Sequence, residues 1–237
     1  RQRQMCIRDR KYSAIGSRNC TVTGYPKFDD LLMSACRRSS NSTDSFHLIW
    51  APHYSYQDNW LRFGAFWDVA EYLFASASEN SGLKITLRPH PALLEKIRLE
   101  PDPRLSSFVY NWQALPNTVL SEEADYSQLF ANADAMLTDG LSFISEYQLF
   151  DKPLLFYARS DSIGFNEAGN KLLDGVYRVH TQDELDKTLN LILNGSENPE
   201  VINARREISS AIRPYPGCAA KNIVECLYNK LISEVKS

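Results

Sequence analysis

Two turns that each follow an apolar run, WAPH and LRPHP, carry side chains suited to chemistry on phosphate groups. Arg88 presents a planar guanidinium that matches phosphate oxygens, and His90 titrates near neutral pH and can donate a proton or a hydrogen bond to a leaving phosphate. Pro89 and Pro91 restrict the backbone that presents both side chains. His53, in the other turn, is a second candidate. Each histidine also has an ordinary interpretation, as a loop residue without a function.

A third polar turn, TDGLS, runs from Thr138 to Ser142. Gly140 permits close approach of the backbone to a ligand, and Ser142 together with the first amides of a following helix would form an anion site. Glu146, about one helical turn further on, would accept a hydrogen bond from a ribose hydroxyl. The alternatives are a plain turn with a helix cap, and for Glu146 a solvated charge.

Several familiar motifs are absent from the sequence. There is no G-x-x-x-x-G-K-[ST] phosphate loop, no G-x-G-x-x-G dinucleotide fingerprint and no G-x-S-x-G nucleophile elbow. The five cysteines form no C-x-x-C pair and the four histidines do not cluster beside them, so we expect neither zinc nor disulfides, and a reducing cytoplasm. Asp139 has no acidic partner at a ligand spacing, so we expect no metal and no cofactor. Arginine, histidine, serine and helix amides must then hold any phosphate.

Composition excludes other classes of protein. The formal net charge of −3 argues against a nucleic-acid binder that relies on a broad basic surface. Hydrophobic residues make up 43% and charged residues 23% of the chain, as in globular proteins. No apolar run approaches the ~18 residues that a membrane-spanning helix needs.

The spacing of apolar residues predicts alternating strands and helices. Short apolar runs that end at prolines or polar turns predict strands over residues 47–53, 83–91, 117–122, 134–140, 152–158 and 175–180. Amphipathic spacing predicts helices over residues 60–77, 91–99, 126–133, 141–150, 182–193, 199–212 and 218–235. Such alternation is typical of an α/β fold with a doubly wound, mainly parallel, Rossmann-like sheet. Ligands bind beyond the carboxyl ends of its strands, where WAPHYS, LRPHP, SEEADYS and TDGLS fall.

The chain divides into three parts by composition. Residues 1–11 hold five of the 26 basic side chains and show no hydrophobic period, so we expect a non-native leader; a basic arm that contacts anionic lipid is the alternative. Residues 12–45 form a hinge segment that leads into the sheet through a serine-rich stretch. Residues 46–237 hold every predicted strand and form one nucleotide-donor-binding domain.

Five segments, in this order and spacing, resemble a known family. They are VTGYPKFDDL, WAPHYS, TLRPHP, the stretch from residue 126 to residue 157, and YPGCAAKNIVE. Together they are similar to the carboxyl-terminal half of the CDP-glycerol glycerophosphotransferases, which make teichoic acids and related polymers. The resemblance runs from about residue 21 to residue 226. It implies a GT-B fold of two facing Rossmann-like domains, of which the amino-terminal domain is missing here.

The resemblance also implies site residues. In the family a histidine and a proline lie at the donor diphosphate, and they correspond to His90 and Pro91. A turn before a helix contacts the donor, and its residues here are Thr138, Asp139, Ser142 and Glu146. A turn at the domain hinge corresponds to Gly24, Tyr25 and Pro26. The family usually has a tyrosine and two adjacent serines where this chain has Gly140, Leu141 and Ser142 followed by Phe143, and this chain has no H-G-T segment.

The implied reaction is phosphoryl transfer, in which an acceptor hydroxyl attacks the β-phosphate of CDP-glycerol and CMP leaves. We assign stabilisation of the phosphate charge to His90 and Arg88, and donor phosphate binding to Ser142 and the amides after Gly140. The general base would come from the missing domain, with His53 the first candidate within this chain. The acceptor would be a lipid-linked cell-wall or capsule polymer, with the intact protein peripheral at the inner face of the cell membrane.

Two other functions fit the same residues. A GT-B glycosyltransferase would use a nucleotide-sugar donor, and attack would fall on a sugar carbon. A non-catalytic nucleotide-binding module would bind the donor without turnover. In either phosphotransferase or glycosyltransferase, chemistry needs both domains, so we expect this chain alone to be inactive and to bind the donor weakly.

Overall fold

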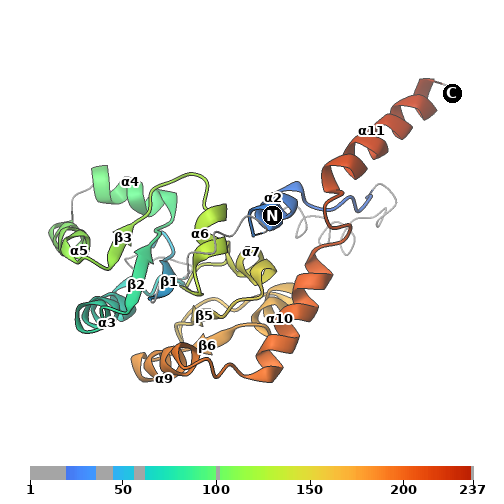
Figure 1. Cartoon of the computed structure of the whole chain (residues 1–237). Coiled ribbons are helices and arrows are strands. Elements are labelled where there is room, and N and C mark those ends of the chain that lie inside the picture. Colours follow the sequence, from blue (N-terminus) through green and yellow to red (C-terminus); the bar gives the residue numbers. More distant parts are fainter. Residues whose placement is uncertain (1–19, 36–44, 56–61, 100–101, 236–237) are drawn as a thin grey trace. The chain divides into compact units, whose positions relative to one another are not determined.

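A computed structural model describes residues 20–35, 45–55, 62–99 and 102–235 (Figure 1). Its centre is one sheet of six parallel strands in the order β3-β2-β1-β4-β5-β6. The strands are β1 (Phe46–Ala51), β2 (Leu83–Leu87), β3 (Thr118–Leu120), β4 (Ala135–Thr138), β5 (Leu154–Tyr157) and β6 (Tyr177–Val179). All six predicted strands are present, and the predicted parallel α/β fold is confirmed.

Helices flank the sheet and bury its apolar strands. The helices among the described residues are α2 (Pro26–Ala35), α3 (Phe66–Glu79), α4 (Pro91–Leu99), α5 (Pro103–Ala114), α6 (Ser127–Asn132), α7 (Ile144–Tyr147), α8 (Glu167–Leu173), α9 (Gln182–Leu193), α10 (Pro199–Ile212) and α11 (Ala219–Val235). Alternate residues of β1 such as Leu48 and Trp50 join one buried cluster with α3, α5 and α9. Ile49 and Met136 are equally buried but lie outside that cluster, so they face the opposite side of the sheet.

Two predicted helices differ from the structure, and one observed helix was not predicted. The helix expected over residues 60–77 begins only at Phe66. The helix expected over residues 141–150 is reduced to the four residues of α7 and a 3-10 turn (Gln148–Phe150) that ends at Asp151 in a left-handed conformation. Sequence patterns also missed α5, which starts where Asp102 accepts hydrogen bonds from two backbone amides and Pro103 occupies the first turn.

The chain divides into two units, of which residues 30–212 form the larger one. The other joins residues 20–29 to the described part of residues 213–237. Within it, the Asp29 carboxylate accepts hydrogen bonds from the amides of Gly217 (2.7 Å) and Ala219 (3.0 Å), and so holds the start of α11. The predicted domain over residues 46–237 includes α11. The predicted domain boundaries stay predictions.

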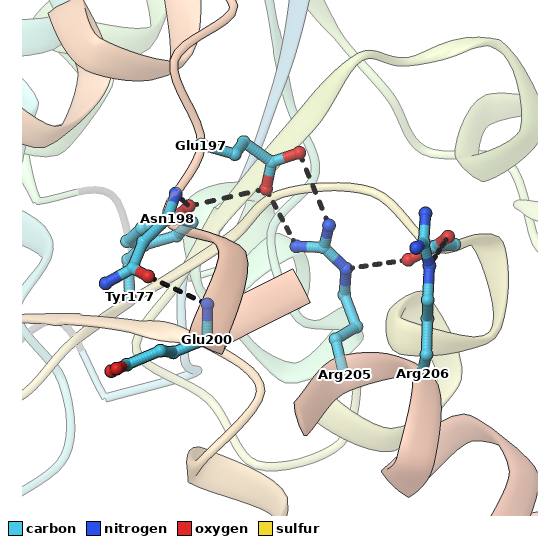
Figure 2. A network of polar contacts seen from close by, with 7 residues as sticks. Tyr177, Glu197, Asn198, Glu200, Arg205 and Arg206 are labelled. Atoms are coloured by element: carbon cyan, nitrogen blue, oxygen red, sulfur yellow. Dashed lines mark hydrogen bonds and ion pairs between the residues drawn. The ribbon is translucent and has the colours of Figure 1, made fainter. Parts of the chain in front are cut away.

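A buried arginine fixes α10 at the end of the larger unit (Figure 2). The Arg205 side chain is 1% exposed and forms an ion pair with Asp151 and a bidentate one with Glu197 at 3.0 and 3.3 Å. The Tyr177 hydroxyl in turn accepts a hydrogen bond from the Asn198 amide at 2.8 Å. One guanidinium therefore ties the turn before β5 to the loop between α9 and α10.

No helix in the described part of the chain is long and apolar enough to cross a membrane.

Candidate functional site

The loops that follow β1, β2 and β4 lie side by side at one edge of the sheet. The chain runs outward from β1 through β2 and β3 on one side, and through β4, β5 and β6 on the other. The carboxyl ends of β1 and β4 therefore form the switch point at which ligands bind in doubly wound sheets. Pairing of β1 with β2 continues past the strand ends, because the Arg88 amide donates to the Trp50 carbonyl (2.7 Å) and the His90 amide to the Pro52 carbonyl (3.3 Å).

His90 is an exposed residue with a defined ring orientation. It stands directly before Pro91, the first residue of α4, and its carbonyl accepts from the amides of Leu93 and Leu94. Its Nδ1 accepts a hydrogen bond from the Ala92 amide at 3.1 Å. A backbone amide is always the donor, so the neutral ring carries its proton on Nε2. His90 can therefore donate from Nε2 to a phosphate oxygen.

His53 lies beside His90, with ring centroids 6.4 Å apart. Tyr54 contacts both rings, at 4.2 Å from His53 and 5.6 Å from His90. The Nδ1 of His53 is 2.7 Å from the Ser55 hydroxyl, and a Cβ at Gly140 would lie 3.9 Å from the His53 ring. Burial, and then the neighbouring charge of His90, lower the pKa of His53 to about 4. The ring is therefore neutral at neutral pH.

We expect the His53 ring to titrate near pH 4 in the folded chain, as measured by the NMR shift of its Cε1 proton. An unfolded histidine titrates near pH ~6.5, so the unfolded state binds more protons between these values. The stability that the neutral ring contributes is then fully present above pH ~6.5 and is lost as the pH falls towards the folded value. His90→Asn removes one cause of the shift and should raise the midpoint. An unchanged midpoint in that variant would contradict the coupling.

Thr138 and Asp139 are buried and fasten the loops of the site. The Thr138 hydroxyl donates to the Ala51 carbonyl at 2.7 Å, which joins the ends of β4 and β1. The Asp139 carboxylate accepts from the amides of His53 and Ala65, both at 2.5 Å. Burial raises the pKa of Asp139 to about 6, although both amide donors oppose the shift. These two side chains position His53. Their predicted direct contact with the nucleotide donor stays a prediction.

Gly64 holds the same loop from its far end. A Cβ at this position would lie 1.5 Å from the carbonyl oxygen of Ser55, so only glycine fits there. Sequence patterns did not predict this role for Gly64, because the contact with Ser55 forms only in the folded chain and no local motif indicates it.

Arg88 is buried at the end of β2, 7% exposed. Its Nη1 donates to the Ser121 hydroxyl at 3.1 Å, and its guanidinium carbon lies 4.9 Å from the ring centroid of Tyr126. Burial lowers the pKa of Arg88, while Tyr126 and the carboxylates of Glu123 and Asp125 oppose that shift. The predicted phosphate-binding side chain is thus packed between the loops after β2 and β3.

Glu146, in α7, is 9% exposed and accepts a hydrogen bond from the Tyr126 hydroxyl at 2.5 Å. The alternative interpretation of Glu146 as a solvated charge is wrong, because α7 packs against the rest of the unit. Ser142 is exposed in the loop after β4. The helix that follows it has four residues, and its first residue receives no side-chain cap. The predicted anion site at this helix terminus has little helix dipole behind it, and it stays a prediction.

Comparison with known protein families gives one match, which covers most of the chain. The family model of the CDP-glycerol:poly(glycerophosphate) glycerophosphotransferases matches residues 7–163. The chain belongs to this family. The resemblance predicted from the sequence is therefore confirmed. A comparison with curated protein sequences returned no match.

Solved structures of other enzymes share the fold of this chain. A structure of the wall teichoic acid polymerase TagF soaked with CDPG matches with a TM-score of 0.57 and 18% identity over 90% of this chain and 50% of that one. The UDP-GlcNAc 2-epimerase of Neisseria meningitidis, bound to UDP-GlcNAc, has a TM-score of 0.55 and 17% identity over 88% and 55%. The UDP-GlcNAc 2-epimerase of Methanocaldococcus jannaschii, in complex with UDP-GlcNAc and UDP, has a TM-score of 0.55 and 17% identity over 88% of this chain and 54% of that one. The chain thus spans about half the length of these proteins.

The remaining predicted site residues lie in the smaller unit. Gly24 has φ of +96°, and a Cβ there would lie 2.8 Å from that of Ala219. Tyr25 is exposed and its ring meets Phe28, and Pro26 begins α2. Their predicted role at a hinge stays a prediction. Among the residues that the structure describes, no three histidine, cysteine or acidic side chains are grouped to hold a metal ion.

Proposed function

We propose that this chain is the donor-binding part of an enzyme that transfers glycerol phosphate, or a similar polyol phosphate, from a CDP-activated donor to a hydroxyl of a cell-wall or capsule polymer. The family match supports the reaction class. The observation that carries the proposal is the position of His90, whose ring is oriented by the Ala92 amide at the strand ends beside the switch point.

In the proposed reaction an acceptor oxygen forms a bond to the β-phosphorus of the donor, and the bond from that phosphorus to the CMP oxygen breaks. His90 donates a hydrogen bond from Nε2 to the phosphate oxygens, where negative charge accumulates on the leaving CMP. Arg88 is packed against Tyr126 and Ser121, so it supplies positive charge to the phosphates from a buried position. Glu146 faces the ribose.

The proton of the acceptor hydroxyl needs a base. His53 is neutral and can accept it, but with a pKa of about 4 it is a weak base. A general base works best when its pKa lies near the working pH. We therefore assign the base to an amino-terminal domain outside this chain. Lipid-linked acceptors at the inner face of the membrane, with peripheral attachment through that domain, complete the proposal.

A nucleotide-sugar donor is the second candidate, because structures that hold UDP-GlcNAc share the fold. Isothermal titration of the chain with CMP, CDP-glycerol and UDP-GlcNAc separates the two. We expect CDP-glycerol to bind more tightly than UDP-GlcNAc. His90→Ala should weaken CDP-glycerol binding by roughly 10- to 100-fold, because a hydrogen bond to a charged group is lost. Lys187→Ala, an exposed change on α9, is the control and should have no effect. Preferential binding of UDP-GlcNAc would overturn the proposal.

A further inference from the structure

Three elements of the larger unit meet at the side chain of Tyr126, the residue before α6. Its ring stacks under the guanidinium of Arg88 from the loop after β2, at 4.9 Å. Its hydroxyl donates to Oε2 of Glu146 in α7, at 2.5 Å. Arg88 and Glu146 are both candidate site residues, they lie 58 positions apart in sequence (146 − 88), and Tyr126 touches both.

The Tyr126 ring is fixed by aromatic neighbours. Phe130, in α6, lies 4.7 Å away, and Phe143, which precedes α7, lies 5.0 Å away in an edge-to-face arrangement. Phe130 and Phe143 also contact one another at 5.1 Å. Because a half-buried ring packed between such neighbours keeps one orientation, the direction of its hydroxyl is also fixed.

A carboxylate accepts up to about four hydrogen bonds, so the Glu146 carboxylate has the capacity to accept from Tyr126 and from a ligand hydroxyl at the same time. The hydroxyl holds one oxygen and thereby sets the rotation of the whole carboxylate. Hydrogen bonds to an ionised acceptor are strong and directional, and a ligand hydroxyl gains most when the carboxylate is already oriented.

We propose that Tyr126 is a positioning residue that orients the Glu146 carboxylate for the ribose hydroxyls of the nucleotide and holds the Arg88 cation beside the same nucleotide. The inference rests on the proposed function in one respect, that the nucleotide binds at this strand edge. Tyr126 itself touches Glu146 and Arg88, and it acts on the ligand only through them.

The test uses two variants of Tyr126 and two ligands. Tyr126→Phe keeps the ring under Arg88 and removes the hydroxyl, whereas Tyr126→Leu removes both. CMP and 2′,3′-dideoxy-CMP differ only in the ribose hydroxyls. We expect the wild-type chain to prefer CMP by about 10-fold, and Tyr126→Phe to lower that ratio towards the value of Glu146→Gln. Tyr126→Leu should also weaken binding of the dideoxy nucleotide, because the Arg88 cation loses its support.

Tyr110→Phe is the matched control, since Tyr110 is 76% exposed on α5 and the same hydroxyl is removed. It should leave both affinities unchanged. A preference for CMP that survives Tyr126→Phe would overturn the proposal, since a merely structural tyrosine would change stability without changing that ratio.

Hydrogen exchange separates this proposal from the proposed function. If the wild-type chain shows no preference for CMP, the proposed nucleotide site is contradicted. Exchange of the backbone amides over residues 144–150 then tests the positioning role by itself. Faster exchange there in Tyr126→Phe, with α9 unchanged, supports an oriented Glu146. Unchanged exchange in α7 overturns the positioning role whatever the ligand.

Discussion

His90→Asn in the full-length enzyme is expected to lower kcat by about 10²- to 10⁴-fold, the usual contribution of a positioned acid or hydrogen-bond donor. Asparagine is an effective helix N-cap, and its side-chain oxygen can replace Nδ1 as the acceptor for the Ala92 amide. The start of α4 should therefore remain intact. The Nε2–H donor is lost, so the charge on the leaving phosphate is no longer stabilised. Steady-state kinetics with CDP-glycerol and a melting curve on the same sample check both expectations.

The matched control for His90 is His180→Asn, because His180 follows β6, the outermost strand on the opposite side of β1, where its Nδ1 lies 2.8 Å from the Ala158 carbonyl. It should keep kcat within about twofold of the wild type, since it lies far from the switch point. Turnover within a few-fold of the wild type in His90→Asn would remove this histidine from the mechanism. A loss of activity that follows a large fall in melting temperature would assign it a structural role.

Arg205→Met should destabilise the larger unit by about 3–5 kcal/mol, because it leaves the carboxylates of Glu197 and Asp151 without their buried cation. Methionine keeps much of the side-chain volume, so the loss reports on charge rather than on a cavity. For a unit of this size the corresponding fall in melting temperature is roughly 10 °C. Urea unfolding followed by circular dichroism measures the change in unfolding free energy.

Arg206→Met serves as the control for the buried cation. Arg206 is paired with the same Asp151 at 2.7 Å, but its side chain is 63% exposed. Exposed ion pairs contribute about 0–1 kcal/mol, so a small change is expected. Equal losses in the two variants would show that burial does not decide the strength of this network.

The strands could be predicted because a parallel sheet covered on both faces needs nearly continuous apolar runs. HLIWA and AMLT read directly as such runs, and both strands are buried in the structure. Helix limits were less accurate where local signals competed. The turn residues around Asp102 and Pro103 are compatible with a loop and with a helix start, and only packing of Leu105 and Trp112 into the core selects the helix.

The site could be predicted as a set of loops but not as a set of contacts. Parallel topology alone places the turns after β1, β2 and β4 at one edge, and this is where His53, His90 and Gly140 lie. The partners of Arg88 depend on the neighbours that the sheet order creates. β3 pairs with β2, so the loop that carries Tyr126 lies beside Arg88, and no local pattern contains that information.

The position of β1 at the centre of the sheet has a consequence for how the chain folds. β1 can pair with β2 early, but its other edge must wait for β4, and the bond from the His53 amide to Asp139 closes across 86 positions of sequence. Contacts of such long range carry a large loop-closure cost and slow the folding of parallel sheets. The growing polypeptide therefore carries the unpaired, apolar edge of β1 until residue 138 has left the ribosome. Unpaired strand edges are prone to aggregation, so during synthesis this edge is a site where a chaperone would act.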